Sequence, residues 1–272
     1  MDVNDFYKLW DREPNEKELD DLKDYWNLRA DEFNNRGRDN CVELKTVLDL
    51  KNFDGRGKSV LDIGCGPGKC VNDLSKEFEK AVGIDISENM ITHARENAAK
   101  LGIENVEFIN APWEKINLKE IGWENNFDVV VASMTPGISS GEQLVKMNEA
   151  SREVCMLSSF VYRRDLKSDI CDHLKISKPE DPARNKIYIA FNILWHMGIY
   201  PEIFYFDPTI IRNYTLEEAV ELYGKELSLD AKEWDRLSSY LENKIDPDGM
   251  IRQNYTAKVA WLYWESKKSG AR

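Results

Sequence analysis

The stretch that decides the fold is Val60-Leu61-Asp62-Ile63-Gly64-Cys65-Gly66-Pro67-Gly68. Four mostly apolar residues, typical of a buried strand, run directly into a segment rich in glycine. Glycine lets the backbone turn sharply and approach a ligand closely, and the helix expected after it offers unpaired N–H groups at its first turn. The motif therefore predicts a strand, a tight turn and a helix that together can hold a nucleoside.

Similar units repeat along the chain after this motif. Short apolar runs predict strands at 60–63, 81–84, 106–109, 127–132 and 154–161. Between the first three runs, apolar residues recur at helical spacing: Val71, Leu74 and Phe78, then Met90, Ala94, Ala98 and Leu101. Alternating strands and helices of this kind predict an α/β fold with a mostly parallel sheet.

The segments before and after these units differ in pattern. Residues 5–50 are expected to be helical, and 186–197 to form an almost wholly apolar helix. Further on, a strand is expected at 203–206, helices at 216–223 and 232–243, and a last strand at 255–264. We therefore expect an N-terminal helical cap over 1–50, a ligand-binding core over 51–162, a helical insertion or lid over 163–201, and a C-terminal part over 202–272 that completes the sheet.

Bulk properties exclude several classes of function. The 272 residues are 42% hydrophobic, with no apolar run long enough for a membrane span and no leader-like start, so we expect a cytoplasmic protein without membrane contact. A net charge of −12 opposes binding to nucleic acid, which requires clustered Lys and Arg. The five cysteines form no CxxC pair and no Cys/His spacing suited to zinc, so reduced thiols and no metal are expected.

The second expected strand ends in Asp85, where a carboxylate can accept both hydroxyls of a ribose. Ser87 follows as a candidate N-cap of the next helix. From Ser59 to about Val161 the chain resembles the class I methyltransferases that use S-adenosylmethionine (SAM), whose first motif is similar to 62–68 here. The resemblance implies a doubly wound, Rossmann-like sheet of seven mostly parallel strands.

The resemblance also implies a SAM site. Gly64, Cys65, Gly66 and Gly68 match the turn that holds the methionine part, and Asp85 matches the acid that holds the ribose. Asp62 matches the acid that faces the methionine ammonium, while Ile86 and Met90 match positions that line the adenine pocket. S-adenosylhomocysteine (SAH) would be the product.

Enzymes that bind nicotinamide dinucleotides share the strand, glycine turn and helix. Their GxGxxG fingerprint would place a third glycine at position 69, where this chain has Lys69. An acid such as Asp62 also suits a cationic amino group better than a pyrophosphate. The sequence thus favours SAM over a dinucleotide, with a purely structural glycine turn as a further alternative.

The chain departs from the family after the third strand, where an acid usually takes the adenine amino group. Pro112 stands in its place, and the neighbouring Trp113 and Glu114 are the residues that can contact adenine instead. A core or edge role for the Trp113 ring is the alternative interpretation.

Ligands of open parallel sheets lie at the carboxyl ends of the strands, so the reacting methyl is expected near Ser133 and Thr135, after the fourth strand. The polar-Pro-Pro-aromatic run of enzymes that methylate exocyclic amines is absent here, which argues against a nucleic-acid acceptor. Thr135 is a candidate for the substrate site, although a simple turn role is equally compatible with it.

The apolar helix at 186–197 carries a polar stripe. Tyr188, Asn192 and His196 are spaced by four residues and therefore share a face. His196 and Tyr188 are the candidates for catalysis, and Asn192, His196 and Tyr25 for substrate contact; an internal hydrogen-bond network or a solvent-facing stripe is the alternative.

These patterns predict an enzyme that transfers a methyl group from SAM to a small-molecule acceptor lying beneath the N-terminal helices and the insertion. The alternatives are an RNA or protein methyltransferase, and a non-catalytic SAM-binding sensor.

Overall fold

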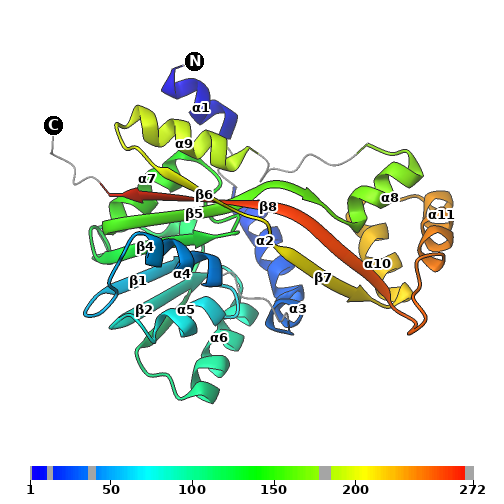
Figure 1. Cartoon of the computed structure of the whole chain (residues 1–272), viewed down its shortest axis with the longest axis horizontal. Helices are drawn as coiled ribbons and strands as arrows, with labels where there is room; N and C mark the ends of the chain where they lie inside the picture. Colours follow the sequence, from blue (N-terminus) through cyan, green and yellow to red (C-terminus); the bar gives the residue numbers. More distant parts are fainter. Residues whose placement is uncertain (1, 11–14, 36–40, 178–184, 267–272) are drawn as a thin grey trace. The chain divides into compact units, whose positions relative to one another are not determined.

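The computed structural model describes residues 2–10, 15–35, 41–177 and 185–266 (Figure 1). The expectation of helices over 5–50 is confirmed: α1 spans Val3–Trp10, α2 Glu16–Leu28, α3 Ala30–Asn35 and α4 Cys41–Leu50. Helix α2 begins with a capping box, in which Asn15 accepts from the Glu18 amide and Glu18 accepts from the Asn15 amide.

The five expected strands are all present: β1 (Ser59–Ile63), β2 (Lys80–Asp85), β3 (Val106–Asn110), β4 (Phe127–Ser133) and β5 (Ser151–Arg164). The last two strands of the path are β6 (Glu202–Phe206) and β8 (Ile251–Glu265), and the spatial order is β3-β2-β1-β4-β5-β8-β6. Strands β1 to β5 pair in parallel. This order confirms the doubly wound, mostly parallel sheet with seven strands along its path; an eighth strand, β7 (Thr209–Tyr214), pairs with β8 off that path.

Helices connect the parallel strands, because two strands that pair in parallel need a crossover connection between them. They are α5 (Lys69–Leu74), α6 (Glu88–Leu101), the short 3-10 helix η1 (Trp113–Lys115) and α7 (Gly141–Ala150). Ser87 caps α6 as predicted, since its hydroxyl accepts from the Met90 amide at 3.1 Å, and Gly102 ends the helix in a left-handed conformation. Helix α7 is missed by the sequence patterns.

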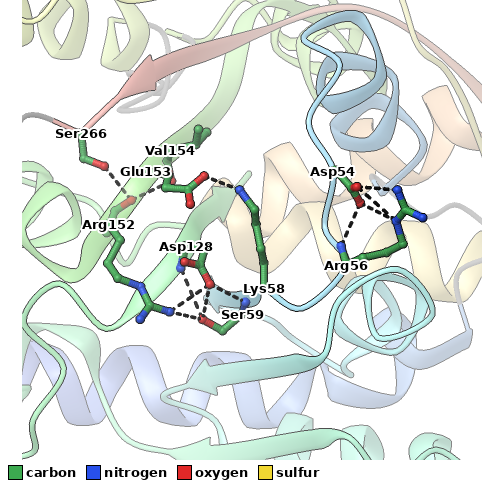
Figure 2. A network of polar contacts seen from close by, with 10 residues as sticks. Asp54, Arg56, Lys58, Ser59, Asp128, Arg152, Glu153, Val154 and Ser266 are labelled. Carbon is green, nitrogen blue, oxygen red and sulfur yellow. Dashed lines mark hydrogen bonds and ion pairs between the residues drawn. The ribbon is translucent and has the colours of Figure 1, made fainter.

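A polar network joins the starts of β1, β4 and β5 (Figure 2). Asp128 accepts from the Ser59 amide at 2.7 Å and from Arg152 at 2.9 Å. Burial raises the pKa of Asp128, but the hydrogen bonds from Ser59 and Arg152 outweigh burial and hold it below its usual range. The network therefore holds together the amino-terminal ends of these three strands, on the side of the sheet opposite to their carboxyl ends.

The main hydrophobic cluster lies around the middle of the sheet. It combines strand residues such as Leu61, Ile84 and Val130 with Leu144 of α7 and Ile193 of α9 (Lys186–His196). The expected apolar helix at 186–197 is therefore confirmed, and its buried side is part of the main core.

Contacts divide the chain into two compact units. The first comprises the described residues of Met1–Ser159, Asn185–Phe204 and Ala260–Arg272, and the second those of Phe160–Arg184 and Tyr205–Val259. The second unit contains α8 (Leu166–Leu174), β7 (Thr209–Tyr214), α10 (Leu216–Glu226) and α11 (Ala231–Glu242), with β7 antiparallel to β8. Helices α10 and α11 and strand β6 confirm the predicted elements, whereas α8 and β7 are missed.

The second unit has its own hydrophobic cluster. Leu166, Ile170, Leu237, Leu241 and Ile251 are buried in it. Within this unit the Gln253 side chain accepts from the Leu166 amide at 2.7 Å, and His173 stacks on Tyr240.

Helix α9 belongs to the first unit and α8 to the second, so the predicted lid over 163–201 contributes to both. The functional boundaries at 50, 162 and 201 stay a prediction. Among the described residues we find no helix both long and apolar enough to span a bilayer.

Candidate functional site

The turn between β1 and α5 brings three glycines into left-handed backbone conformations. Gly64, Gly66 and Gly68 have φ values of 72°, 53° and 73°, which side-chain-bearing residues rarely adopt. The amides of Gly64 and Cys65 both donate to the Ile84 carbonyl, at 2.8 and 3.1 Å. The turn is thereby fixed to the end of β2, where Asp85 lies.

Asp85 is the polar centre of this turn. One carboxylate oxygen accepts from the Gly66 amide and the other from the Ser87 amide, both at 2.9 Å. Burial raises the pKa of Asp85, and the two backbone hydrogen bonds act in the opposite direction. Each carboxylate oxygen has two lone pairs, so the group can also accept hydrogen bonds from a diol.

The other residues expected around the turn are close to it. The sulfur of Met90 lies 3.9 Å from the place where a Cβ on Gly66 would be, and Met90 itself is buried. Asp62, at the end of β1, is 3% exposed. Burial raises the pKa of the Cys65 thiol well above its usual value, and the nearby Asp85 and Asp62 carboxylates add to this effect. The Cys65 side chain therefore contributes a neutral, buried thiol to the turn.

The segment after β3 is held by side chains from other elements. Asn110 donates to the carbonyls of Asp85 and Ile86, at 3.1 and 2.9 Å, and so ties β3 to β2 beyond the ends of both strands. Pro112 is half-buried and precedes η1.

The Trp113 ring is buried in the main hydrophobic cluster, with the Lys146 ammonium 5.0 Å from the ring centroid. Packing in the core agrees with the structural interpretation of this ring. Glu114, in η1, is half-buried. Adenine contacts by the Trp113 backbone or by Glu114 stay a prediction.

The carboxyl end of β4 has an unusual backbone. Met134 adopts a φ of 53° and its amide donates to the carbonyl and the hydroxyl of Ser158, while Ser133 and Ser158 have their hydroxyls 3.3 Å apart. The next residue, Thr135, is 7% exposed, and its Oγ1 lies 2.0 Å from the Cβ position of Gly64. The chain thus brings Thr135 directly onto the glycine turn, and its place near the reacting methyl stays a prediction.

The polar stripe of α9 has other neighbours. The rings of Tyr188 and His196 lie 5.9 and 5.8 Å from that of Phe6 in α1, and both side chains are exposed. Asn192 donates to the Tyr188 carbonyl within α9. Tyr25 is 41% exposed and accepts from Arg29. Any role of these four residues in substrate contact or catalysis stays a prediction.

Two polar residues near the turn are missed by sequence reasoning. Lys186, the first residue of α9, is buried and donates to the Thr135 carbonyl at 2.7 Å. Asn27 of α2 accepts from the Ser87 hydroxyl at 2.7 Å, and the amide of the same Ser87 donates to the Asp85 carboxylate. The sequence patterns did not indicate either contact, because each of the two residues lies far in sequence from the residue that it contacts.

The donors and acceptors around the turn fit SAM. Gly66 has no atom nearer to its Cβ position than the Met90 sulfur, so ligand atoms can approach its backbone closely. The indole N–H of Trp113 is buried without a hydrogen-bond acceptor among the described residues. Within that part of the chain, no group of three His, Cys, Asp or Glu side chains is arranged to hold a metal ion.

Solved structures with the same fold support the topology. The chain is similar to magnesium protoporphyrin IX methyltransferase from Synechocystis, crystallised with bound SAH, with a TM-score of 0.55 and 14% identity over 91% of this chain and 99% of that one. It is also similar to precorrin 8w decarboxylase from Methanobacterium thermoautotrophicum, with a TM-score of 0.50, 13% identity, and coverage of 84% and 92%. At these identities the likeness shows the fold alone.

Sequence relatives match a shorter part of the chain. A dTDP-3-amino-3,4,6-trideoxy-alpha-D-glucopyranose N,N-dimethyltransferase from Streptomyces venezuelae is 38% identical over 61 residues, 22% of this chain and 26% of that protein. A ubiquinone biosynthesis O-methyltransferase from Aliivibrio fischeri is 31% identical over 100 residues, 36% of this chain and 42% of that protein. The chain thus spans less than half the length of these relatives.

A family model described as a methyltransferase domain matches residues 54–233, which include the glycine turn, Asp85 and the end of β4. The match covers more than half of the chain, and the sheet order and turn geometry agree with it. The chain therefore belongs to the methyltransferase domain family, as the resemblance to class I SAM-dependent methyltransferases predicts.

Proposed function

We propose that the protein transfers the methyl group of SAM to a small-molecule acceptor. The observation that carries the proposal is the Asp85 carboxylate, which is held between the Gly66 and Ser87 amides at 2.9 Å each. This arrangement orients an acceptor of hydrogen bonds toward the glycine turn, where the ribose of SAM would lie. Asp62, Gly64, Cys65, Gly68, Ile86 and Met90 complete the proposed cofactor site, with Pro112, Trp113, Glu114 and Ser133 at its margins.

Methyl transfer from SAM requires little of the protein beyond the alignment of the two reactants. The bound sulfonium supplies an already activated methyl group, so the residues around it need to hold the two reactants in line and exclude water. The buried Thr135 and the fixed turn at Ser133 would form the wall behind the acceptor. His196 or Tyr188 would be needed only if the acceptor must lose a proton first.

A small acceptor is favoured over a macromolecule by two features. The net charge of −12 opposes binding to the phosphate backbone of a nucleic acid. The segment after β4 also lacks the polar-Pro-Pro-aromatic run of enzymes that methylate exocyclic amines. The curated relatives named above are called N,N- and O-methyltransferases of small molecules, which supports the same class.

Calorimetry with SAH tests the cofactor site. We expect Asp85→Ala to weaken SAH binding by about 1 to 3 kcal/mol, because hydrogen bonds to a charged group are lost. Asp54→Ala is the matched control, since that carboxylate pairs with Arg56 on an exposed loop and should leave the affinity unchanged. Equal affinity of Asp85→Ala and wild type would refute the ribose role.

Incubation with SAM carrying a labelled methyl group and pooled small metabolites tests the transfer itself. Label in a small molecule supports the enzyme, and label in added RNA or protein would replace the proposed acceptor class. Tight binding of SAM with no transfer to any of these pools would instead indicate a non-catalytic sensor. If transfer is found, an unchanged rate in His196→Ala and Tyr188→Phe would remove both as catalytic candidates.

A further inference from the structure

A small cavity lies within the second unit of the chain. It has a volume of about 200 Å³, and its lining is mostly charged: Arg164, Lys244 and Arg252, the carboxylates Asp165 and Asp169, and Gln253. All of these residues belong to the second unit. Pockets for drug-sized ligands have volumes of about 300 to 1,000 Å³, so this cavity suits a ligand below that size.

The Gln253 carboxamide is fixed at the base of the cavity. Gln253 is 4% exposed, and its Oε1 accepts from the Leu166 amide at 2.7 Å and from the Tyr223 hydroxyl at 3.2 Å. A backbone N–H only donates, so the atom that faces Leu166 must be the carboxamide oxygen. The Gln253 Nε2 is buried and has no hydrogen-bond acceptor in the part of the chain that the structure describes. Since a buried N–H group without an acceptor is costly, this amide indicates an acceptor that a ligand supplies.

Lys244 adds a positive charge at the rim of the same cavity. Its side chain is exposed, and its ammonium lies 4.9 Å from the centroid of the Tyr240 ring, with no carboxylate among the described residues as an ion-pair partner. The two arginines of the lining do have carboxylate partners, which are Asp169 and Asp172 for Arg164 and Asp246 and Asp248 for Arg252. Each guanidinium has five N–H donors, which is more than these pairs use.

The two carboxylates of the lining are engaged within α8 and its flank. Asp165 caps the helix, where its Oδ1 accepts from the amide and the hydroxyl of Ser168, both at 2.9 Å. Asp169 accepts from Arg164 at 2.9 Å. The cavity therefore combines engaged carboxylates with an ammonium and a buried amide that can still donate, which is a set of groups suited to an anion.

We propose that this cavity binds a small oxyanion, the carboxylate or phosphate group of a low-molecular-weight ligand. Gln253 donates to it from the base and Lys244 from the rim, and hydrogen bonds with an ionised partner are the stronger kind. The net charge of −12 repels anions from the protein as a whole, so binding requires a local cluster of donors such as this one. The inference does not depend on the SAM site, because the glycine turn belongs to the first unit.

Nuclear magnetic resonance of the glutamine side chains tests the site directly. The chain has two glutamines, Gln143 and Gln253, so ¹⁵N-labelled glutamine gives two side-chain amide signals, and Gln143 in the first unit is the internal reference. We expect inorganic phosphate or acetate, each added at constant ionic strength against chloride, to shift the Gln253 signal to saturation and to leave Gln143 in place. The anion that saturates at the lower concentration identifies the source of the oxyanion group as a phosphate or a carboxylate.

Two variants examine the base and the rim of the cavity. Gln253→Glu keeps an oxygen for Leu166 and Tyr223 but replaces the NH₂ group by a negative oxygen, so calorimetry should show binding of the preferred anion weakened by at least about 10-fold. Lys244→Met should weaken it by about 2- to 5-fold, because a charge on the rim is screened by solvent. Lys225→Met is the matched control, since that exposed lysine of the same unit pairs with Glu221 outside the cavity, and it should bind as wild type does.

Three results would overturn the inference. The first is a Gln253 signal that does not move with either anion, and the second is an equal shift of the Gln143 and Gln253 signals. The third is a Lys244→Met protein that binds the anion as tightly as wild type and Lys225→Met do. Because Lys244 is exposed, this last comparison holds even if Gln253→Glu does not fold.

Discussion

At the residue scale, the glycine turn combines a backbone requirement with close packing. Gly68 has a φ of 73°, and a Cβ there would lie 2.7 Å from the Ala94 Cβ and 2.8 Å from the Phe108 ring. Gly102 has a similar φ of 66°, but no atom lies within 4 Å of its Cβ position. A comparison of the two glycines therefore separates the free-energy cost of a left-handed backbone from the cost of a steric clash between an added Cβ and its neighbours.

This difference predicts unequal effects of alanine at the two positions. Gly102→Ala should lower the free energy of unfolding by about 1 to 2 kcal/mol, the cost of a left-handed residue with a Cβ. Gly68→Ala should lose a further 1 to 3 kcal/mol or so, because the added methyl overpacks the contact between α5, α6 and β3. Chemical denaturation of both variants measures the difference; equal losses would show that the neighbours of Gly68 move aside at little cost.

Sequence reasoning at this scale succeeded where local structure follows from local pattern. The left-handed turn at Gly64, the cap at Ser87 and the position of Asp85 at the end of its strand all follow from nearest neighbours in the chain. Lys186 could not be identified in this way. Its burial and its hydrogen bond to the Thr135 carbonyl depend on tertiary packing, which the local sequence pattern does not determine.

At the element scale, the strands were predictable because buried parallel strands are short, continuous apolar runs. Elements with weaker patterns were missed. Helix α7 has few apolar residues, although Ser140, which accepts from the Gln143 amide three residues on, was a readable capping signal. Helix α8 begins at a similar cap, Asp165, which accepts from the Ser168 amide. Strand β7 starts directly after Pro208, within a stretch that reads as a turn.

The network at the starts of β1, β4 and β5 predicts a pH-dependent contribution to stability (Figure 2). Because the folded pKa of Asp128 is lowered, its carboxylate stabilises the fold above the unfolded pKa of about 3.9, and this contribution is lost as the pH falls through the folded value. Asp128→Asn keeps an acceptor for the Ser59 amide but removes the charge that faces Arg152.

We expect Asp128→Asn to be less stable than wild type by about 1 to 2 kcal/mol at pH 7. The gap between the two proteins should begin to narrow as the pH falls below the unfolded pKa of about 4, and it should close as the pH falls through the lowered pKa of the folded carboxylate. Urea denaturation of both proteins across this range measures the gap. A gap that is the same at pH 7 and at pH 3 would show that the charge of Asp128 does not contribute.

At the scale of the whole molecule, each of the two units has a hydrophobic cluster of its own, and the proposed cofactor turn lies entirely in the first. Leu237 is fully buried in the cluster of the second unit, and Leu74 is equally buried behind the turn in the first. A ligand that binds only the folded form of one unit stabilises that unit by an amount that rises with the logarithm of the ratio of its concentration to the dissociation constant. The two leucines can therefore report on the units separately.

We expect Leu237→Ala to cost about 2 to 5 kcal/mol and to speed hydrogen exchange in α8, α10 and α11, while the affinity for SAH stays as in wild type. Leu74→Ala should instead speed exchange in β1, α5 and β2, and SAH at about 100 times its dissociation constant should restore roughly 2.7 kcal/mol there. Peptide-resolved exchange with and without SAH measures both effects. Equal acceleration of exchange around Gly64 and in α10 by Leu237→Ala would contradict this expectation. It would mean that the two units unfold together as one cooperative body, since a cavity in the second cluster would then destabilise the first unit as much as the second.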